Sequence, residues 1–175
     1  TCYFFKGSAE CGTFRTVGDY TTGEGEVEIF IKRVGGQSSS GNILWMIADG
    51  PGLSGAMFEP IALQLASALR DRYTIYLMDH RGTGQSTPNL HCPLQAGETE
   101  ESPEGNCIEF LEDTYGDTME YFNTKFIARD YILITEELTD PGDTVLLYGA
   151  GYGGFIINNI LLEDPDIADA VVLDS

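Results

Sequence analysis

The sequence is poor in basic residues and in histidine. It has 9 lysines and arginines against 28 aspartates and glutamates, a formal net charge of −19, and only 2 histidines. A negative field of this size repels phosphate backbones and anionic lipids, so we expect no nucleic-acid and no membrane partner. No apolar run is long enough to cross a bilayer. The start, Thr1-Cys2-Tyr3, lacks the basic flank and apolar run of a signal peptide and is interpreted as a mature or trimmed end.

Cysteine is also scarce, and its spacing limits the possible sites. The four cysteines form two local groups, Cys2 with Cys11 and Cys92 with Cys107. Neither group has the short paired spacing of zinc ligands, and two histidines are too few to complete a zinc site, so no metal is expected. Three pairings are possible, and local pairing is the most economical. Two disulfides predict a secreted protein or another oxidising compartment, with four reduced structural cysteines as the alternative.

Length and hydrophobic periodicity indicate one α/β domain. With 175 residues, 42% of them hydrophobic, the chain can bury one core. Apolar strands that alternate with amphipathic helices are typical of a mostly parallel, doubly wound sheet covered on both faces. A long polar segment at 82–118 is predicted as a loop, with an excursion from the domain at about 87–118. The predicted strands are 26–34 (edge or half-exposed), 42–48, 73–78, 144–147 and 170–173, and the predicted helices are 58–69, 121–138 and 155–162.

One glycine-rich turn carries the most specific signal. Residues 148–154 are Tyr-Gly-Ala-Gly-Tyr-Gly-Gly, between an apolar strand and an apolar helix. This is the frame of the Gly-x-Ser-x-Gly nucleophile elbow, in which Gly149, Gly153 and Gly154 would shape the turn. Gly151 takes the serine position, and glycine has no side chain with which to attack a carbonyl or hold an acyl group. The motif therefore predicts a catalytic scaffold without its nucleophile.

Two loops follow earlier predicted strands. In Asp49-Gly50-Pro51-Gly52, a glycine allows a backbone N–H to point at a developing oxyanion, although an ordinary Pro-Gly turn is the simpler interpretation. Residues 79–86 are Asp-His-Arg-Gly-Thr-Gly-Gln-Ser, where Asp79 and Arg81 can tie neighbouring loops together by charge-assisted hydrogen bonds. We expect His80 to be structural and His91, in the polar segment, to face solvent.

The order of these three loops resembles the prolyl aminopeptidase and tripeptidyl aminopeptidase branch of the α/β-hydrolases. Residues 11–20 are similar to its entry strand, 122–130 to its helix with Ala-Arg-Asp, and 164–174 to its Asp-Pro…Val-Val-Leu-Asp strand. The resemblance implies an α/β-hydrolase core that acts on peptide or ester substrates through a serine, without a metal or other cofactor. It also implies that the oxyanion is bound by the N–H groups of Tyr152 and Gly50.

The sequence departs from this branch at three points. Asp49 replaces a glycine and brings a negative charge near the expected oxyanion site, and Gly151 replaces the nucleophile. The acid and the histidine follow the elbow in this fold, so neither histidine of the chain can serve and no triad is present. Because 170–173 would then be an unpaired apolar edge, we expect residues 1–175 to be an incomplete core without lid and C-terminal strands. A missing C-terminal segment or a complementary chain would complete it.

Three functional hypotheses follow. The first is a serine-peptidase-like hydrolase by ancestry that is inactive as the chain stands. The second is a non-catalytic pseudoenzyme that binds a peptide or a partner. The third rests on Gly149-x-Gly151-x-x-Gly154, which matches the dinucleotide-binding fingerprint, with Asp174 placed to hold a ribose. That fingerprint usually opens the first strand–helix–strand unit of a domain, and it leaves the loops 49–52 and 79–86 unexplained.

Overall fold

A mixed six-stranded sheet forms the centre of the part of the chain that the structure, a computed structural model, describes: residues 9–35, 41–70, 72–92 and 106–174. The strand order is β1-β2-β4-β3-β5-β6. β1 and β2 pair antiparallel, as do β2 and β4, whereas β4, β3, β5 and β6 pair in parallel. The strands are β1 (Ala9–Val17), β2 (Glu26–Val34), β3 (Ile43–Ile47), β4 (Thr74–Met78), β5 (Val145–Ala150) and β6 (Ala170–Asp174).

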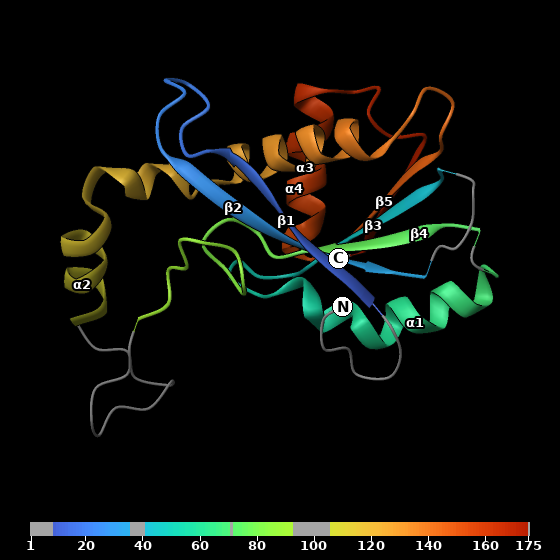
Figure 1. Ribbon diagram of the computed structural model, residues 1–175, viewed down its shortest axis with the longest axis horizontal. Coiled ribbons are helices and arrows are strands. Elements are labelled where there is room, and N and C mark those ends of the chain that lie inside the picture. Colours follow the sequence, from blue (N-terminus) through green and yellow to red (C-terminus); the bar gives the residue numbers. More distant parts are fainter. Residues whose placement is uncertain (1–8, 36–40, 71, 93–105, 175) are drawn as a thin grey trace.

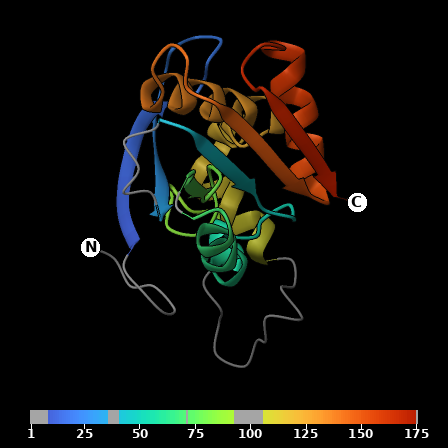
Figure 2. The ribbon, with the colours of Figure 1, turned by 90° about the vertical axis from the view of Figure 1, so that its right-hand side faces the viewer.

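Helices cover both faces of this sheet. Figure 1 shows α1 (Glu59–Ala68) on one face and α3 (Thr124–Leu138) and α4 (Tyr152–Glu163) on the other, and Figure 2 shows the same layers from the side. Each face has its own apolar cluster, one built with α1 and one with α3 and α4. The predicted α/β fold with a mostly parallel, doubly covered sheet is confirmed.

The central strands are buried on both faces, as parallel strands between two helical layers must be. All five residues of β3 and all five of β4 are buried. The single tryptophan, Trp45 in β3, packs edge-on against Tyr131 of α3 at 5.1 Å between ring centroids. Its indole N–H donates to Thr135 Oγ1 at 2.9 Å, which satisfies the one polar atom of the side chain in the core.

The structure differs from the sequence-based expectation mainly in the polar segment. There α2 (Asn106–Tyr115) and the 3-10 helix η2 (Gly116–Tyr121) stand where we predicted loop. α2 has a partly buried apolar face at Cys107, Leu111 and Tyr115, although Ile108 is 66% exposed. The acidic and turn-forming residues around it favoured a loop over this short periodicity. α3 begins at Thr124 rather than 121 because the Asn123 side chain caps it, accepting from Phe126 N at 2.9 Å.

The two ends of the sheet agree in part with the predictions. β2 is half-exposed but lies between β1 and β4, so it is no edge strand. β1 forms within a segment that showed little periodicity, where only the family resemblance had indicated a strand. Among the described strands β6 pairs only with β5, and its Val172 and Leu173 are exposed, which agrees with the expected apolar edge at 170–173.

One of the two expected disulfides lies within the described residues. Cys92 and Cys107 are bonded, with their Cα atoms 5.5 Å apart. Cys11 also takes part in a disulfide, and Cys2, its expected partner, lies outside the described residues. No helix in the described part has the length and apolar character needed to span a bilayer.

Candidate functional site

The three loops singled out in the sequence meet at one edge of the sheet. β4, β3 and β5 are neighbours and run parallel, so the loops 49–52, 79–86 and 151 onward all follow the carboxyl ends of adjacent strands. Ligands of open α/β sheets bind at this edge. The fold therefore brings together the candidate residues of all three motifs.

The turn at Gly151 has the backbone of a sharp strand-to-helix elbow. Gly151 has φ 51° and ψ −115°, in the left-handed range of φ that glycine adopts without strain. α4 begins at the next residue and packs closely on the sheet. A Cβ on Gly153 would lie 2.2 Å from the carbonyl oxygen of Ile47, and one on Gly149 would lie 2.6 Å from the backbone of Gly153. Those two glycines are required by packing, whereas a Cβ on Gly154 would meet nothing closer than 3.9 Å.

The two N–H groups expected to bind an oxyanion both donate to a side chain of the protein itself. Asp49 Oδ1 accepts from Tyr152 N at 2.9 Å and from Gly50 N at 2.8 Å. These hydrogen bonds, that of Tyr152 first, hold the pKa of the Asp49 carboxyl below its ordinary value. A carboxylate thus stands where an oxyanion would be stabilised.

The same carboxylate takes the space of a side chain at residue 151. A Cβ on Gly151 would lie 2.1 Å from Asp49 Oδ1 and 2.5 Å from its Cγ. Real Cβ atoms do not approach other atoms so closely, so this position of Asp49 and any side chain at 151 exclude one another. Sequence reasoning placed a negative charge near the site but missed this contact. The available signal was that residues 49 and 151 both depart from the motifs of the branch that the sequence resembles.

Asp79 fastens the second loop to the segment that follows the first. Its Oδ1 accepts from Ser54 Oγ at 2.6 Å and from Gly55 N at 2.8 Å, at the start of the 3-10 helix η1 (Gly55–Phe58). Its Oδ2 accepts from Gln85 N at 2.8 Å. These three hydrogen bonds hold the buried carboxylate inside the protein, and through them Asp79 positions the loops.

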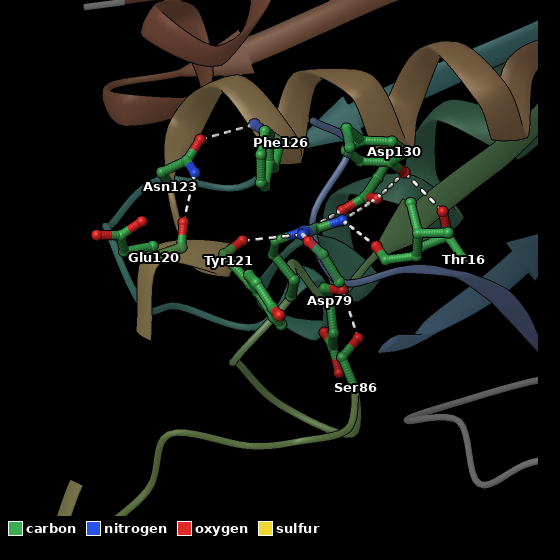
Figure 3. A network of polar contacts seen from close by, with 12 residues as sticks. Thr16, Asp79, Ser86, Glu120, Tyr121, Asn123, Phe126 and Asp130 are labelled. Carbon is green, nitrogen blue, oxygen red and sulfur yellow. Dashed lines mark hydrogen bonds and ion pairs between the residues drawn. The ribbon is translucent and has the colours of Figure 1, made fainter. Parts of the chain in front are cut away.

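Arg81 donates hydrogen bonds to a buried network that includes Asp130 and Tyr121, both labelled in Figure 3. Its Nε and one terminal nitrogen donate to the two carboxylate oxygens of Asp130, and both side chains are 0% exposed. The terminal nitrogens also donate to the carbonyl oxygens of Gly18, Tyr121 and Val17. These five hydrogen bonds use all five N–H groups of the guanidinium. Arg81 therefore joins the β1–β2 turn, η2 and α3, and offers no free donor to a ligand.

Neither histidine is placed as a catalytic base. His80 is buried, its Nε2 lies 3.2 Å from the Tyr131 hydroxyl, and burial lowers its pKa to about 4. His91 is exposed, as predicted. Among the described residues, no three histidine, cysteine or acidic side chains gather as a metal site.

A pocket of about 690 Å³ adjoins the elbow. It is lined by the loops at 51–52, 80–84 and 89–91 and by Phe122, Ile127 and Tyr152. Tyr152, whose backbone N–H is bonded to Asp49, therefore also contributes to the wall of the pocket. The structure leaves a ligand-sized space beside the elbow, where the two expected oxyanion donors are bonded to Asp49.

Comparison with known proteins identifies the fold. A sequence model described as the alpha/beta hydrolase fold matches residues 47–175. Similar solved structures include a candidate epoxide hydrolase from Pseudomonas aeruginosa (18% identity, TM-score 0.58), covering 99% of this chain and 43% of that one. An epoxide hydrolase from Vigna radiata (18%, 0.59) covers 96% and 39%. A laboratory-evolved variant of a potato epoxide hydrolase (17%, 0.62) covers 95% and 39%.

These similarities bear on the fold and leave the finer resemblance open. The chain spans about two fifths of each of these structures, and all three identities are below one fifth. No curated protein matches the sequence. The aminopeptidase branch predicted from the motifs is not confirmed, since the similar solved structures named above are epoxide hydrolases.

Proposed function

The chain belongs to the alpha/beta hydrolase fold family, and on that premise we propose that it is a non-catalytic member of hydrolase ancestry that binds a peptide or ester ligand without cleaving it. One observation carries the proposal. The Asp49 carboxylate accepts from both expected oxyanion donors and fills the space of the nucleophile side chain.

Acyl transfer by a serine needs both of the features that this site lacks. The nucleophile forms the covalent intermediate, and the N–H donors stabilise the charge that develops on the carbonyl oxygen. Loss of the nucleophile alone costs several orders of magnitude in turnover, and what remains comes from those donors and from binding. Because Asp49 is bonded to both donors, the part of the remaining rate enhancement that these donors would supply is also lost. The pocket that could bind a ligand remains.

The paired change supports a native binding protein over a recently disabled enzyme. Replacement of one serine by glycine in an intact enzyme accounts for Gly151 but not for Asp49. The aminopeptidase branch remains our proposal for the ancestry, because the loop 79–86 follows its Asp-x-Arg-Gly-Thr-Gly-x-Ser pattern.

The dinucleotide hypothesis is opposed by the charges at the same turn. A pyrophosphate would bind at the N-terminus of α4, where the Asp49 carboxylate already accepts from Tyr152 N. Asp174, expected to hold the ribose, accepts a hydrogen bond from the Tyr148 hydroxyl at 2.8 Å.

Turnover is the test of the proposed function. The purified protein is incubated with coumarin amides of amino acids and tripeptides and with nitrophenyl esters, and heat-denatured protein serves as the blank. We expect no hydrolysis above the blank and no labelling by a fluorophosphonate. Phe122→Ala, which removes a ring from the pocket wall, is the matched variant. Saturable hydrolysis by the native protein that Phe122→Ala reduces would overturn the proposal, whereas a rate common to both belongs to a contaminant.

A further inference from the structure

Among the described residues, the wall of the pocket beside Asp49 carries almost no charge without a partner, although the protein as a whole has a net charge of −19. Leu90, Phe122 and Ile127 give it an apolar and aromatic part. Besides the phenol of Tyr152, the ionisable residues in its lining are Arg81, His80 and His91. Two of these, Arg81 and His80, are buried, so it matters first whether either offers a charge to a ligand.

Neither of these two buried side chains offers a charge to a ligand. The guanidinium of Arg81 is paired with Asp130, with its five N–H groups bonded inside the protein. His80 is buried against Tyr131, and its pKa of about 4 leaves it neutral at physiological pH. The third, His91, is exposed to solvent, which screens its interactions.

A negative charge lies beside the pocket. Asp49 Oδ1 lies 2.9 Å from the backbone nitrogen of Tyr152, a lining residue. Pro51, another lining residue, is two peptide units along the chain, which bounds the distance between the two Cα atoms at about 7 Å. The backbone donors that would otherwise attract a carboxylate are bonded to Asp49. An anion in this pocket thus meets a repulsive charge and no free backbone donor at the elbow.

We propose that the pocket selects uncharged, mainly apolar ligands with an amide or ester group and discriminates against the corresponding carboxylates. The inference rests on the proposed function and names the class of ligand that the site holds. A hydrolase that lost its chemistry in this way would keep affinity for the uncleaved form of a substrate and disfavour its acidic product. Two like charges about 8 Å apart, one Debye length at physiological salt, repel one another in a partly hydrated site. We expect this repulsion to lower the affinity for a carboxylate by about two- to fivefold.

A matched pair of ligands tests the proposal. Phenylacetamide and phenylacetate have the same shape and differ in charge, and their dissociation constants are measured by NMR titration of the native protein at about pH 8 and about 0.15 M salt. We expect phenylacetamide to bind about two- to fivefold more tightly. Asp49→Asn keeps an oxygen for both N–H groups and removes the charge, so the two affinities should become equal. Asp49→Gly frees the donors, so phenylacetate should become the tighter ligand.

The outcomes separate this proposal from the proposed function. Phe122→Ala should weaken both ligands to the same degree. Equal or tighter binding of phenylacetate to the native protein, a ratio that Asp49→Asn leaves unchanged, or no binding of either ligand would overturn the selectivity. Conversion of phenylacetamide to phenylacetate, visible in the same spectra, would overturn the non-catalytic function and leave the measured selectivity standing.

Discussion

The mutual exclusion of Asp49 and a side chain at residue 151 can be measured by a double-mutant cycle. Gly151→Ala is made in the native protein and in the Asp49→Gly background. In the native protein the new Cβ would lie 2.1 Å from Asp49 Oδ1, so the carboxylate must leave and abandon its bonds to Gly50 N and Tyr152 N. In the Asp49→Gly background the three atoms nearest to the new Cβ, all from the Asp49 carboxylate, are absent.

The structure divides the cost of Gly151→Ala into two parts. A non-glycine residue at φ 51° carries backbone strain of about 1–3 kcal/mol, which is present in both backgrounds. The displacement of Asp49 adds to it only in the native protein. For a chain of this size each kcal/mol lowers the melting temperature by about 2–4 °C. We therefore expect a loss of about 1–3 kcal/mol without Asp49 and a larger one with it.

Urea unfolding, followed by the fluorescence of the buried Trp45 and by circular dichroism, measures these free energies of unfolding. Gly23→Ala is the matched control, because Gly23 has φ 78° and its added Cβ would meet nothing within 4 Å. Its cost reports backbone strain alone and should be the same in both backgrounds. Distant sites add within about 0.3–0.5 kcal/mol. If the cost of Gly151→Ala differs between the backgrounds by no more than that, the contact with Asp49 does not exist as described.

Three further predictions concern the same loops. Gly151→Ser should stay unlabelled by a fluorophosphonate, because no histidine is placed to activate it, and rapid labelling of residue 151 would show that the protein does hold a base within reach of that hydroxyl. Arg81→Met should lower the free energy of unfolding in urea by about 3–5 kcal/mol, since it leaves a buried carboxylate uncompensated; the half-exposed pair broken by Arg129→Met should cost at most about 1 kcal/mol, and similar losses would refute the argument. His80, with its pKa lowered from 6.5 to about 4, binds its proton first in the unfolded state, so stability should fall as the pH falls through that window, by up to about 3 kcal/mol. His80→Gln should flatten this slope in urea titrations and His91→Gln should not; a slope that both leave intact would contradict it.

The sequence predicted the parts of the fold that carry a periodic signal. The continuous apolar runs at 42–48 and 73–78 became the central strands β3 and β4, because strands buried on both faces need apolar residues at every position. The turn at 148–154 gave the elbow, since only glycines allow α4 to approach β3 and β5 so closely. α2 was missed although Cys107, Leu111 and Tyr115 recur at helical spacing, because this face is short and lies in an acidic segment rich in turn formers.

The chemistry of the site was harder to predict because it depends on contacts between residues that are distant in the sequence. Arg81 was expected to tie loops together, but its partner Asp130 lies 49 residues away, and nothing in either local pattern names the other. Asp49 and Tyr152 are separated by 103 residues. The sequence motifs predicted the loop in which each residue lies. The loops come within hydrogen-bonding distance of one another only because β4, β3 and β5 are adjacent parallel strands.

The geometry also couples residues 49 and 151 at the elbow. A Cβ at residue 151 would lie 2.1 Å from Asp49 Oδ1, so a side chain there requires the carboxylate to leave its present position. With glycine at 151, the carboxylate accepts from N–H groups at the N-terminus of α4, where the helix dipole favours a negative charge. A serine introduced at residue 151 alone would therefore have to displace Asp49 and break its bonds to Gly50 N and Tyr152 N.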